Sequence, residues 1–304
     1  MDPETHSRQQ TRTQKAFAVL PTLLTLGNAV CGFGAITILA RVGPSTSVYQ
    51  AQFFATQMVF ASQLIFLAML FDALDGSAAR LTNQMSDFGA QLDSLADVIS
   101  FGVAPAFMML KLTHPDHLMM NSILHPPFLY PPRFLWPIAA LFVMCAALRL
   151  ARFNAETDEE DMHDGFSGLP SPAAGGVIAA FPIGIMGLKN LLEKESFRWA
   201  APVQDYVLPA LWMLLPFITL ATASLMVTRI HYPHVINQFL RGHRGRRQIV
   251  QLIFALVLVV AVHEMALPVL LCWFAFSAPT RAIMQHYVKP WLAARKGKSE
   301  SIVR

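Results

Sequence analysis

Four aspartates occupy two closely spaced segments of an otherwise apolar part of the chain. Asp72 and Asp75 are three residues apart, and Gly89, Asp93 and Asp97 follow one another at intervals of four. On helices, these spacings place each set on one face. A charged residue within a membrane is costly and normally marks a polar cavity. Two such faces, joined by a short loop, would bring four carboxylates together.

Carboxylates held this closely call for a positive counter-charge. At low dielectric they would repel one another strongly, and divalent cations relieve that repulsion. A site with only oxygen ligands suits Mg²⁺, Mn²⁺ or Ca²⁺. Two such ions could clamp a pyrophosphate and stabilise a phosphoryl displacement. We therefore expect a two-ion site at Asp72, Asp75, Asp93 and Asp97; the alternative is a set of helix-end carboxylates that face water.

Small and basic residues accompany the carboxylates. Gly76 and Gly89 remove side chains beside them, so that a nucleotide or a neighbouring helix can approach closely. Ala79 is also small, and Arg80 could neutralise phosphate at the cytoplasmic edge. These features favour a phosphate-bearing ligand.

The composition indicates that these segments are membrane helices. Hydrophobic residues make up 54% of 304 positions and charged residues 14%, with a mean hydropathy of +0.45. A soluble domain carries about a quarter charged residues. The sequence predicts an all-α, polytopic helix bundle of about eight spans, with seven as the alternative because only His263, Glu264 and Pro268 separate the last two. The spans are expected near 18–40, 51–74, 88–111, 134–153, 171–188, 205–228, 248–263 and 265–285.

The basic residues predict the orientation. With both termini inside, most of the 23 Lys and Arg residues fall in cytoplasmic segments, which also requires an even number of spans. The active site would then face the cytoplasm. A net charge of +4 gives no argument for nucleic acid, and the basic cluster at 241–247 is expected to contact anionic lipid.

At the aspartates the sequence resembles the CDP-alcohol phosphotransferase family. The family signature D-x2-D-G-x2-A-R-x8-G-x3-D-x3-D is met at every fixed position, namely Asp72, Asp75, Gly76, Ala79, Arg80, Gly89, Asp93 and Asp97. The resemblance implies a six-helix catalytic core, commonly a homodimer, that cleaves a CDP-linked lipid and releases CMP. By this analogy Asp72, Asp75 and Asp93 ligate metal, and Asp97 ligates metal or deprotonates the acceptor hydroxyl. Gly76, Ala79, Arg80 and Gly89 would line the cytidine-diphosphate pocket.

Three further segments are similar to bacterial, membrane-embedded phosphatidylserine synthases. They are the stretch from Pro21 through Asn28 to Phe33, the stretch Arg149-Leu-Ala-Arg152-Phe-Asn154, and the stretch from Phe166 to Ala174. The resemblance implies CDP-diacylglycerol and L-serine as substrates and the bacterial inner membrane as location. The resemblance covers most of residues 18–233, which we expect to be the catalytic membrane domain. Composition and hydropathy alone predict the other parts, namely a cytoplasmic segment at 1–17, a basic loop with two added helices at 234–285, and a basic tail at 286–304.

Five polar residues outside the signature are candidate substrate contacts. Arg149 and Arg152 lie three apart at a cytoplasmic helix end and could bind donor phosphates or the serine carboxylate, or could anchor the helix. Asn154 could contact substrate or cap backbone groups. Thr25 and Asn28 could contact cytidine or phosphate, or form helix–helix hydrogen bonds.

Two other functions compete with transfer to serine. The same chemistry could use glycerol 3-phosphate or inositol phosphate, which would need extra basic residues around the cavity. An ion transporter could also use intramembrane aspartates, but it would predict discontinuous helices and repeated halves. All four aspartates fall in one block of the sequence, with no internal repeat.

Overall fold

The structure is a computed structural model that describes residues 3–43, 48–82, 87–114, 130–156, 166–194, 202–232 and 263–284. Nearly all of these residues are helical, which confirms the predicted all-α class. The helices are α1 (Pro3–Arg41), α2 (Val48–Thr82), α3 (Asp87–Asp97), η1 (Val98–Val103), α4 (Ala104–Thr113), α6 (Pro132–Glu156), α7 (Ser171–Lys194), η2 (Val203–Val207), α9 (Leu208–Val227) and α12 (His263–Ile283). Two short strands, β1 (Phe166–Ser167) and β2 (His231–Tyr232), complete the described elements.

Six segments of the described chain are long and apolar enough to cross a membrane. They are Leu20–Arg41, Gln52–Ala78, Phe88–Thr113, Pro132–Ala155, Ser171–Leu192 and Val203–Val227, and they match the first six predicted spans. The second span continues past its predicted end at 74, since helix α2 runs on to Thr82 and includes the buried Asp75. Most of the predicted seventh span lies outside the described residues. The predicted eighth span coincides with α12, which is not one of the six segments, so the count of eight is not confirmed.

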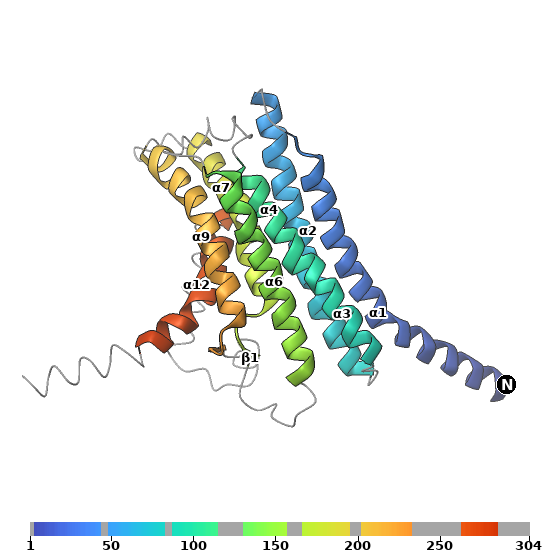
Figure 1. The fold of residues 1–304 in the computed structure, drawn as a ribbon. Helices are drawn as coiled ribbons and strands as arrows, with labels where there is room; N and C mark the ends of the chain where they lie inside the picture. Colours follow the sequence, from blue (N-terminus) through green and yellow to red (C-terminus); the bar gives the residue numbers. More distant parts are fainter. Residues whose placement is uncertain are drawn as a thin grey trace, which may run out of the picture.

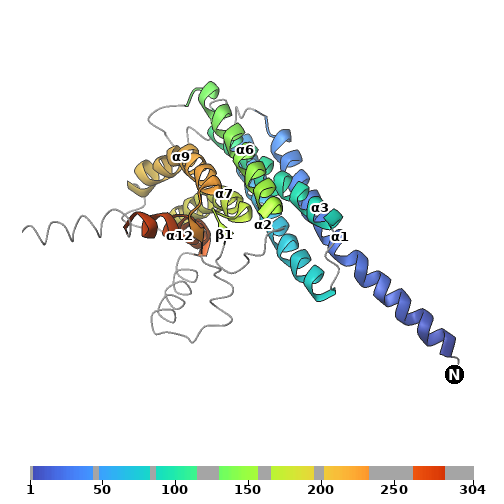
Figure 2. The same cartoon turned by 60° about the horizontal axis from the view of Figure 1, so that its bottom comes forward.

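The helices form one elongated bundle (Figures 1 and 2). Helix α1 packs along α2 and also contacts α3, while α7 packs between α2 and α12. The N-terminal part of α1 projects beyond the bundle (Figure 1). Its side chains, and the predicted basic loop and tail, are outside the described residues.

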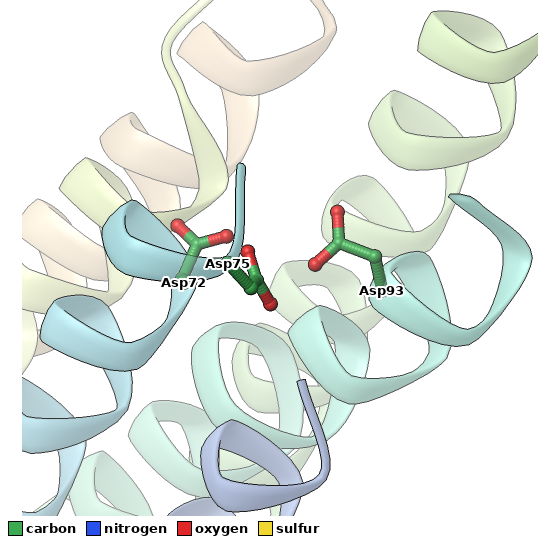
Figure 3. Close-up of side chains that lie close together, drawn as sticks. All are labelled: Asp72, Asp75 and Asp93. Carbon is green, nitrogen blue, oxygen red and sulfur yellow. The ribbon is translucent and has the colours of Figure 1, made fainter. Parts of the chain in front are cut away.

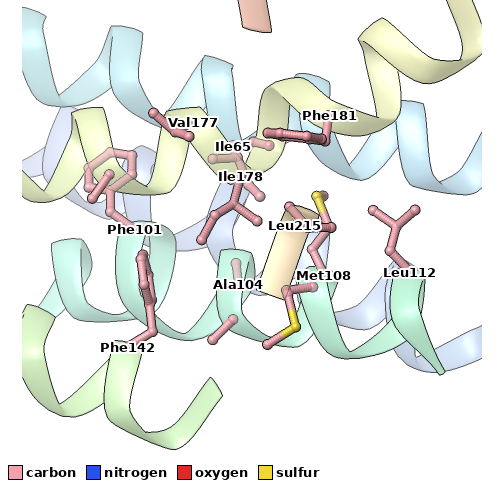
Figure 4. Packing of buried hydrophobic residues seen from close by; sticks show 14 of the residues in the cluster. Ile65, Phe101, Ala104, Met108, Leu112, Phe142, Val177, Ile178, Phe181 and Leu215 are labelled. Carbon is pink, nitrogen blue, oxygen red and sulfur yellow. The ribbon is translucent and has the colours of Figure 1, made fainter. Parts of the chain in front are cut away.

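Apolar side chains from five helical segments meet in the middle of the bundle. Ile65, Phe101, Phe142, Ile178 and Leu215 are buried there and come from α2, η1, α6, α7 and α9 (Figure 4). Outward-facing side chains such as Phe33, Phe60 and Trp136 are also apolar. A bundle that is apolar on both sides is typical of helices surrounded by lipid.

The third span contains a π-helical turn directly after Asp97. Helices α3, η1 and α4 follow one another without a break, and η1 occupies Val98–Val103. Within this turn Ser100, Phe101 and Gly102 are buried. Single π-helical turns inside α-helices occur often at functional sites.

A two-stranded clip joins the start of α7 to the end of α9. Phe166 pairs with Tyr232 and Ser167 with His231, in antiparallel register. Gly168 N–H then donates to the Ile230 carbonyl at 2.9 Å, and Leu169 N–H donates to the Leu225 carbonyl at 3.0 Å. The clip therefore fixes where α7 begins.

Substituting Gly168 by alanine is expected to lower the thermal unfolding midpoint measurably. Gly168 has φ +86°, and an added Cβ would lie 2.5 Å from the Met226 carbonyl oxygen. The left-handed conformation alone costs a residue with a side chain about 1–2 kcal/mol, and the contact adds to this. The matched control is Gly43→Ala, because a Cβ at Gly43 meets no atom of the described residues within 4 Å. Equal midpoints for the two variants in detergent would contradict this account of the clip.

Candidate active site

Helices α2 and α3 bring three of the four predicted aspartates together. Asp72 and Asp75 project from α2 toward Asp93 on α3 (Figure 3). One carboxylate oxygen from each lies within 4.8 Å of the others. Asp75 is 5% exposed, whereas Asp72 and Asp93 are half-buried. The prediction that Asp72 and Asp75 lie close to Asp93 is therefore confirmed.

Asp97 lies one helical turn after Asp93 and is 6% exposed. Its carboxylate is close enough to those of Asp72 and Asp93 to experience their charges. Asp97 Oδ1 accepts a hydrogen bond from Asn28 Nδ2 at 3.0 Å. The fourth aspartate thus borders the cluster of three and has a side-chain partner on α1.

Thr25 makes a similar contact with another member of the cluster. Its Oγ1 lies 2.8 Å from Asp75 Oδ2, to which the hydroxyl can donate, and 3.0 Å from the Pro21 carbonyl oxygen. Thr25 and Asn28 are both buried and lie three residues apart on one face of α1. Of the two roles expected for these residues, contact with the nucleotide or hydrogen bonds between helices, the structure shows hydrogen bonds between helices.

The three-carboxylate cluster has the chemistry of a divalent-metal site. Its donors are all carboxylate oxygens, which suit hard cations such as Mg²⁺ and Mn²⁺. Asp93 Oδ1 is buried and has no hydrogen-bond partner among the described residues. A buried oxygen of this kind is unfavourable unless it has a positive partner. The residues present therefore fit a metal ion.

Arg149 on α6 is a cation next to this acidic group. Its guanidinium is within electrostatic range of Asp97 and Asp72. Nη1 donates a hydrogen bond to Ser171 Oγ at 2.8 Å, and Ser171 is the buried first residue of α7. Arg149 Nε is buried and has no partner among the described residues. This buried N–H belongs to a charged group that lies close to the acidic residues.

The other candidates near the end of α6 are arranged differently. Asn154 Nδ2 donates to Ser94 Oγ at 2.9 Å, so this side chain links α6 to α3 beside Asp93. Arg152 is half-buried and lies one turn further along α6 than Arg149. The substrate roles of Arg152 and Asn154 remain predictions.

The small residues of the signature lie along the same two helices. A Cβ added to Gly76 would meet no atom of the described residues within 4 Å. Gly89 lies in the first turn of α3. Ala79 and Arg80 lie in the last turns of α2, and their side chains are outside the described part of the structure. The surface of α2 directly after Asp75 is therefore not covered by the described residues.

The matching family model carries the description CDP-alcohol phosphatidyltransferase and covers residues 18–214. This range contains all four aspartates, Arg149 and the helices that position them.

Three similar proteins carry names that mention serine. A protein of Methanocaldococcus jannaschii, named CDP-diacylglycerol–serine O-phosphatidyltransferase, is 39% identical over 118 residues, which cover 39% of this chain and 48% of that protein. A Helicobacter pylori protein of the same name is 34% identical over 178 residues, covering 59% and 62% of the two chains. An archaetidylserine synthase of Methanothermobacter thermautotrophicus is 32% identical over 222 residues, covering 72% of each chain. The match thus spans about half to two thirds of the first two relatives.

Proposed function

Because this chain belongs to the CDP-alcohol phosphatidyltransferase family, we propose that it transfers the phosphatidyl group of CDP-diacylglycerol to L-serine, giving phosphatidylserine and CMP. The observation that carries the proposal is the meeting of Asp72, Asp75 and Asp93 beside Asp97 within membrane-spanning helices. The names of the relatives support serine as the acceptor.

The arrangement of charges suits a direct displacement at phosphorus. Asp72, Asp75 and Asp93 would hold one or two divalent ions, Mg²⁺ or Mn²⁺ or else Ca²⁺, and a bound ion supplies positive charge to the pyrophosphate. The serine hydroxyl forms the new oxygen–phosphorus bond, Asp97 accepts the hydroxyl proton, and the bond to the CMP oxygen breaks. A neutral hydroxyl is a poor nucleophile, so a positioned base is useful. No enzyme nucleophile is required.

The donor is expected to enter from the membrane. Its acyl chains would stay in lipid, while its cytidine lies near Gly76, Ala79, Arg80 and Gly89 at the cytoplasmic end of α2 and α3. The surface at Gly76, which no described residue covers, supports this placement. We place the protein in the bacterial inner membrane as a homodimer with both termini in the cytoplasm, and we keep 18–233 as the catalytic domain.

Arg149 is the residue we assign to the acceptor carboxylate. It lies near Asp97, where the acceptor hydroxyl must bind, and its buried Nε has no hydrogen-bond partner in the described part of the chain. A guanidinium pairs well with a carboxylate through two N–H groups. The assignment distinguishes serine from alcohols that lack a carboxylate.

Replacing Arg149 by lysine is expected to raise KM for serine about tenfold and to leave KM for CDP-diacylglycerol within about threefold, because lysine keeps the charge but loses the paired N–H geometry. The comparison variant is Arg152→Lys, at the next turn of the same helix. Steady-state kinetics in detergent micelles measures both constants. If KM for the donor rises instead, Arg149 binds the donor phosphates, and the assignment to the acceptor is wrong.

The experiment that tests the function is an acceptor panel. Purified protein with CDP-diacylglycerol and Mn²⁺ or Mg²⁺ is given L-serine, glycerol 3-phosphate or inositol phosphate, and CMP release is measured. The proposal predicts release with serine and little with the two phosphorylated alcohols, which need additional cations. If a phosphorylated alcohol drives release and serine does not, the family chemistry stands and the serine proposal fails.

A further inference from the structure

Helix α1 contributes an asparagine whose contacts connect it with the proposed base. Asn28 has no exposed surface, and its Nδ2 donates to Asp97 Oδ1 at 3.0 Å. Its Oδ1 is buried and accepts no hydrogen bond among the described residues. Leaving such an oxygen without a partner costs about 1–3 kcal/mol. An apolar residue would avoid that cost, so packing alone does not account for Asn28.

The segment that carries Asp97 also contacts the backbone of α1 at Asn28. Ser100, in the π-helical turn after Asp97, donates its hydroxyl to the Asn28 carbonyl oxygen at 2.9 Å. One turn along α1, a Cβ on Gly32 would lie 2.7 Å from Ser100 Cα. Helix α1 therefore approaches the π-helical turn as closely as a glycine permits. Asn28 is held between two residues, Asp97 and Ser100, that lie three apart on the facing segment.

We propose that Asn28 is a positioning residue for Asp97. Its amide holds carboxylate oxygen Oδ1, so that the side chain of Asp97 keeps one rotamer and leaves Oδ2 to accept the proton of the acceptor hydroxyl. The Ser100 hydrogen bond and the contact at Gly32 fix Asn28 itself relative to the turn that carries Asp97. The inference rests on the proposed function, because it assigns Asn28 to the base step of that reaction.

Thr25 provides the internal comparison. It lies on the same face of α1 and contacts the same acidic group, but its partner is Asp75 in the proposed metal site. A residue that positions the base should affect turnover, whereas one that positions a metal ligand should change the metal concentration required. The two positions are therefore expected to give different kinetic signatures.

The test begins with Asn28→Leu, which keeps the length and branching of the side chain and removes the donor. A hydrogen bond to a charged group is worth about 1.5–3 kcal/mol, so kcat is expected to fall about 10- to 100-fold. KM for CDP-diacylglycerol and the half-saturating Mn²⁺ concentration should stay within about threefold, since neither involves Asp97 Oδ1. Thr25→Val should instead raise the half-saturating Mn²⁺ concentration, and Thr37→Val, an exposed hydroxyl on α1, serves as the neutral control.

Exchanging the side chains of Asn28 and Asp97 distinguishes a role of Asn28 in positioning the base from a role in stabilising the fold. Asn28→Asp places two carboxylates side by side and should lower the thermal unfolding midpoint of metal-free protein. Adding Asp97→Asn restores one donor and one acceptor, so the midpoint should recover. Turnover should not recover, because the base is now on the wrong helix.

Failure of the positioning role of Asn28 can be distinguished from failure of the proposed transfer to serine. Three results would overturn the positioning role: an unchanged kcat in Asn28→Leu, a rise of its KM for CDP-diacylglycerol as large as its fall in kcat, or turnover by the double variant Asn28→Asp, Asp97→Asn. In each case serine-dependent CMP release by the wild type would still support the proposed function. If the wild-type protein releases no CMP with any acceptor, the proposed function fails and the positioning role fails with it.

Discussion

Replacing Asp97 by asparagine is expected to lower kcat for CMP release about 10²- to 10⁴-fold, the range that a positioned general base contributes. The substitution keeps the shape of the side chain, and its carbonyl oxygen can still accept the hydrogen bond from Asn28 Nδ2. The fold should therefore persist. The cluster of Asp72, Asp75 and Asp93 is untouched, so KM for the donor should change little.

The measurement is steady-state CMP release at saturating CDP-diacylglycerol, serine and Mn²⁺. Asp205→Asn is the matched control, because Asp205 is exposed in η2, outside the acidic group. The unfolding midpoint of each variant confirms that the comparison is between folded proteins. Turnover within about threefold of the wild type would show that another group accepts the proton.

The second large effect is expected from Asp93→Asn. The substitution should raise the thermal unfolding midpoint of the metal-free protein, and it should weaken the stabilisation of the protein by added metal. Without metal, three carboxylates crowd one space and Asp93 Oδ1 has no partner among the described residues. Removing one negative charge should then raise the thermal unfolding midpoint. With metal, the variant has lost a ligand, so its metal affinity should fall by about 100-fold or more. Even mutating a residue that only hydrogen-bonds to a metal ligand lowers metal affinity about 10- to 100-fold.

The measurement is the unfolding midpoint as a function of Mn²⁺ concentration. Binding to the native state stabilises it in proportion to the logarithm of the ligand concentration over Kd. The wild-type midpoint should climb with added Mn²⁺ and return after chelation, while that of Asp93→Asn should start higher and stay nearly flat. An Mn²⁺ response equal to that of the wild type would remove Asp93 from the metal site.

The acidic group was predictable because helical periodicity alone decides which residues share a face. Intervals of three and four placed Asp72 with Asp75 and Asp93 with Asp97, and the short connection left little choice about which faces meet. The structure confirms the helices and brings three of the carboxylates within one space.

The partners of the carboxylates were harder to identify. Thr25 and Asn28 were recognised as a polar pair in an apolar helix, but periodicity cannot tell whether such a face meets a ligand or another helix. The structure resolves this because α1 packs against both α2 and α3. A buried carboxylate needs hydrogen-bond donors, so a polar pair at this spacing was the available signal for Asp75 and Asp97.

Two features had no clear signal in the sequence. The π-helical turn at Val98–Val103 packs closely against α1, where Ser100 lies next to Gly32, a residue far away in the chain. The strand pairing of Phe166–Ser167 with His231–Tyr232 involves segments of two residues, too short for an alternating pattern. Both involve tertiary contacts, which a single sequence does not show.

The most direct test of the central claim is to identify the lipid that the protein makes. Purified protein is incubated with CDP-diacylglycerol, Mn²⁺ and nitrogen-15-labelled L-serine, and lipid and nucleotide products are quantified by mass spectrometry. Transfer to serine predicts labelled phosphatidylserine and CMP in equal amounts, both lost on chelation. CMP without labelled lipid, or labelled lipid that forms equally well in Asp97→Asn, would contradict the account.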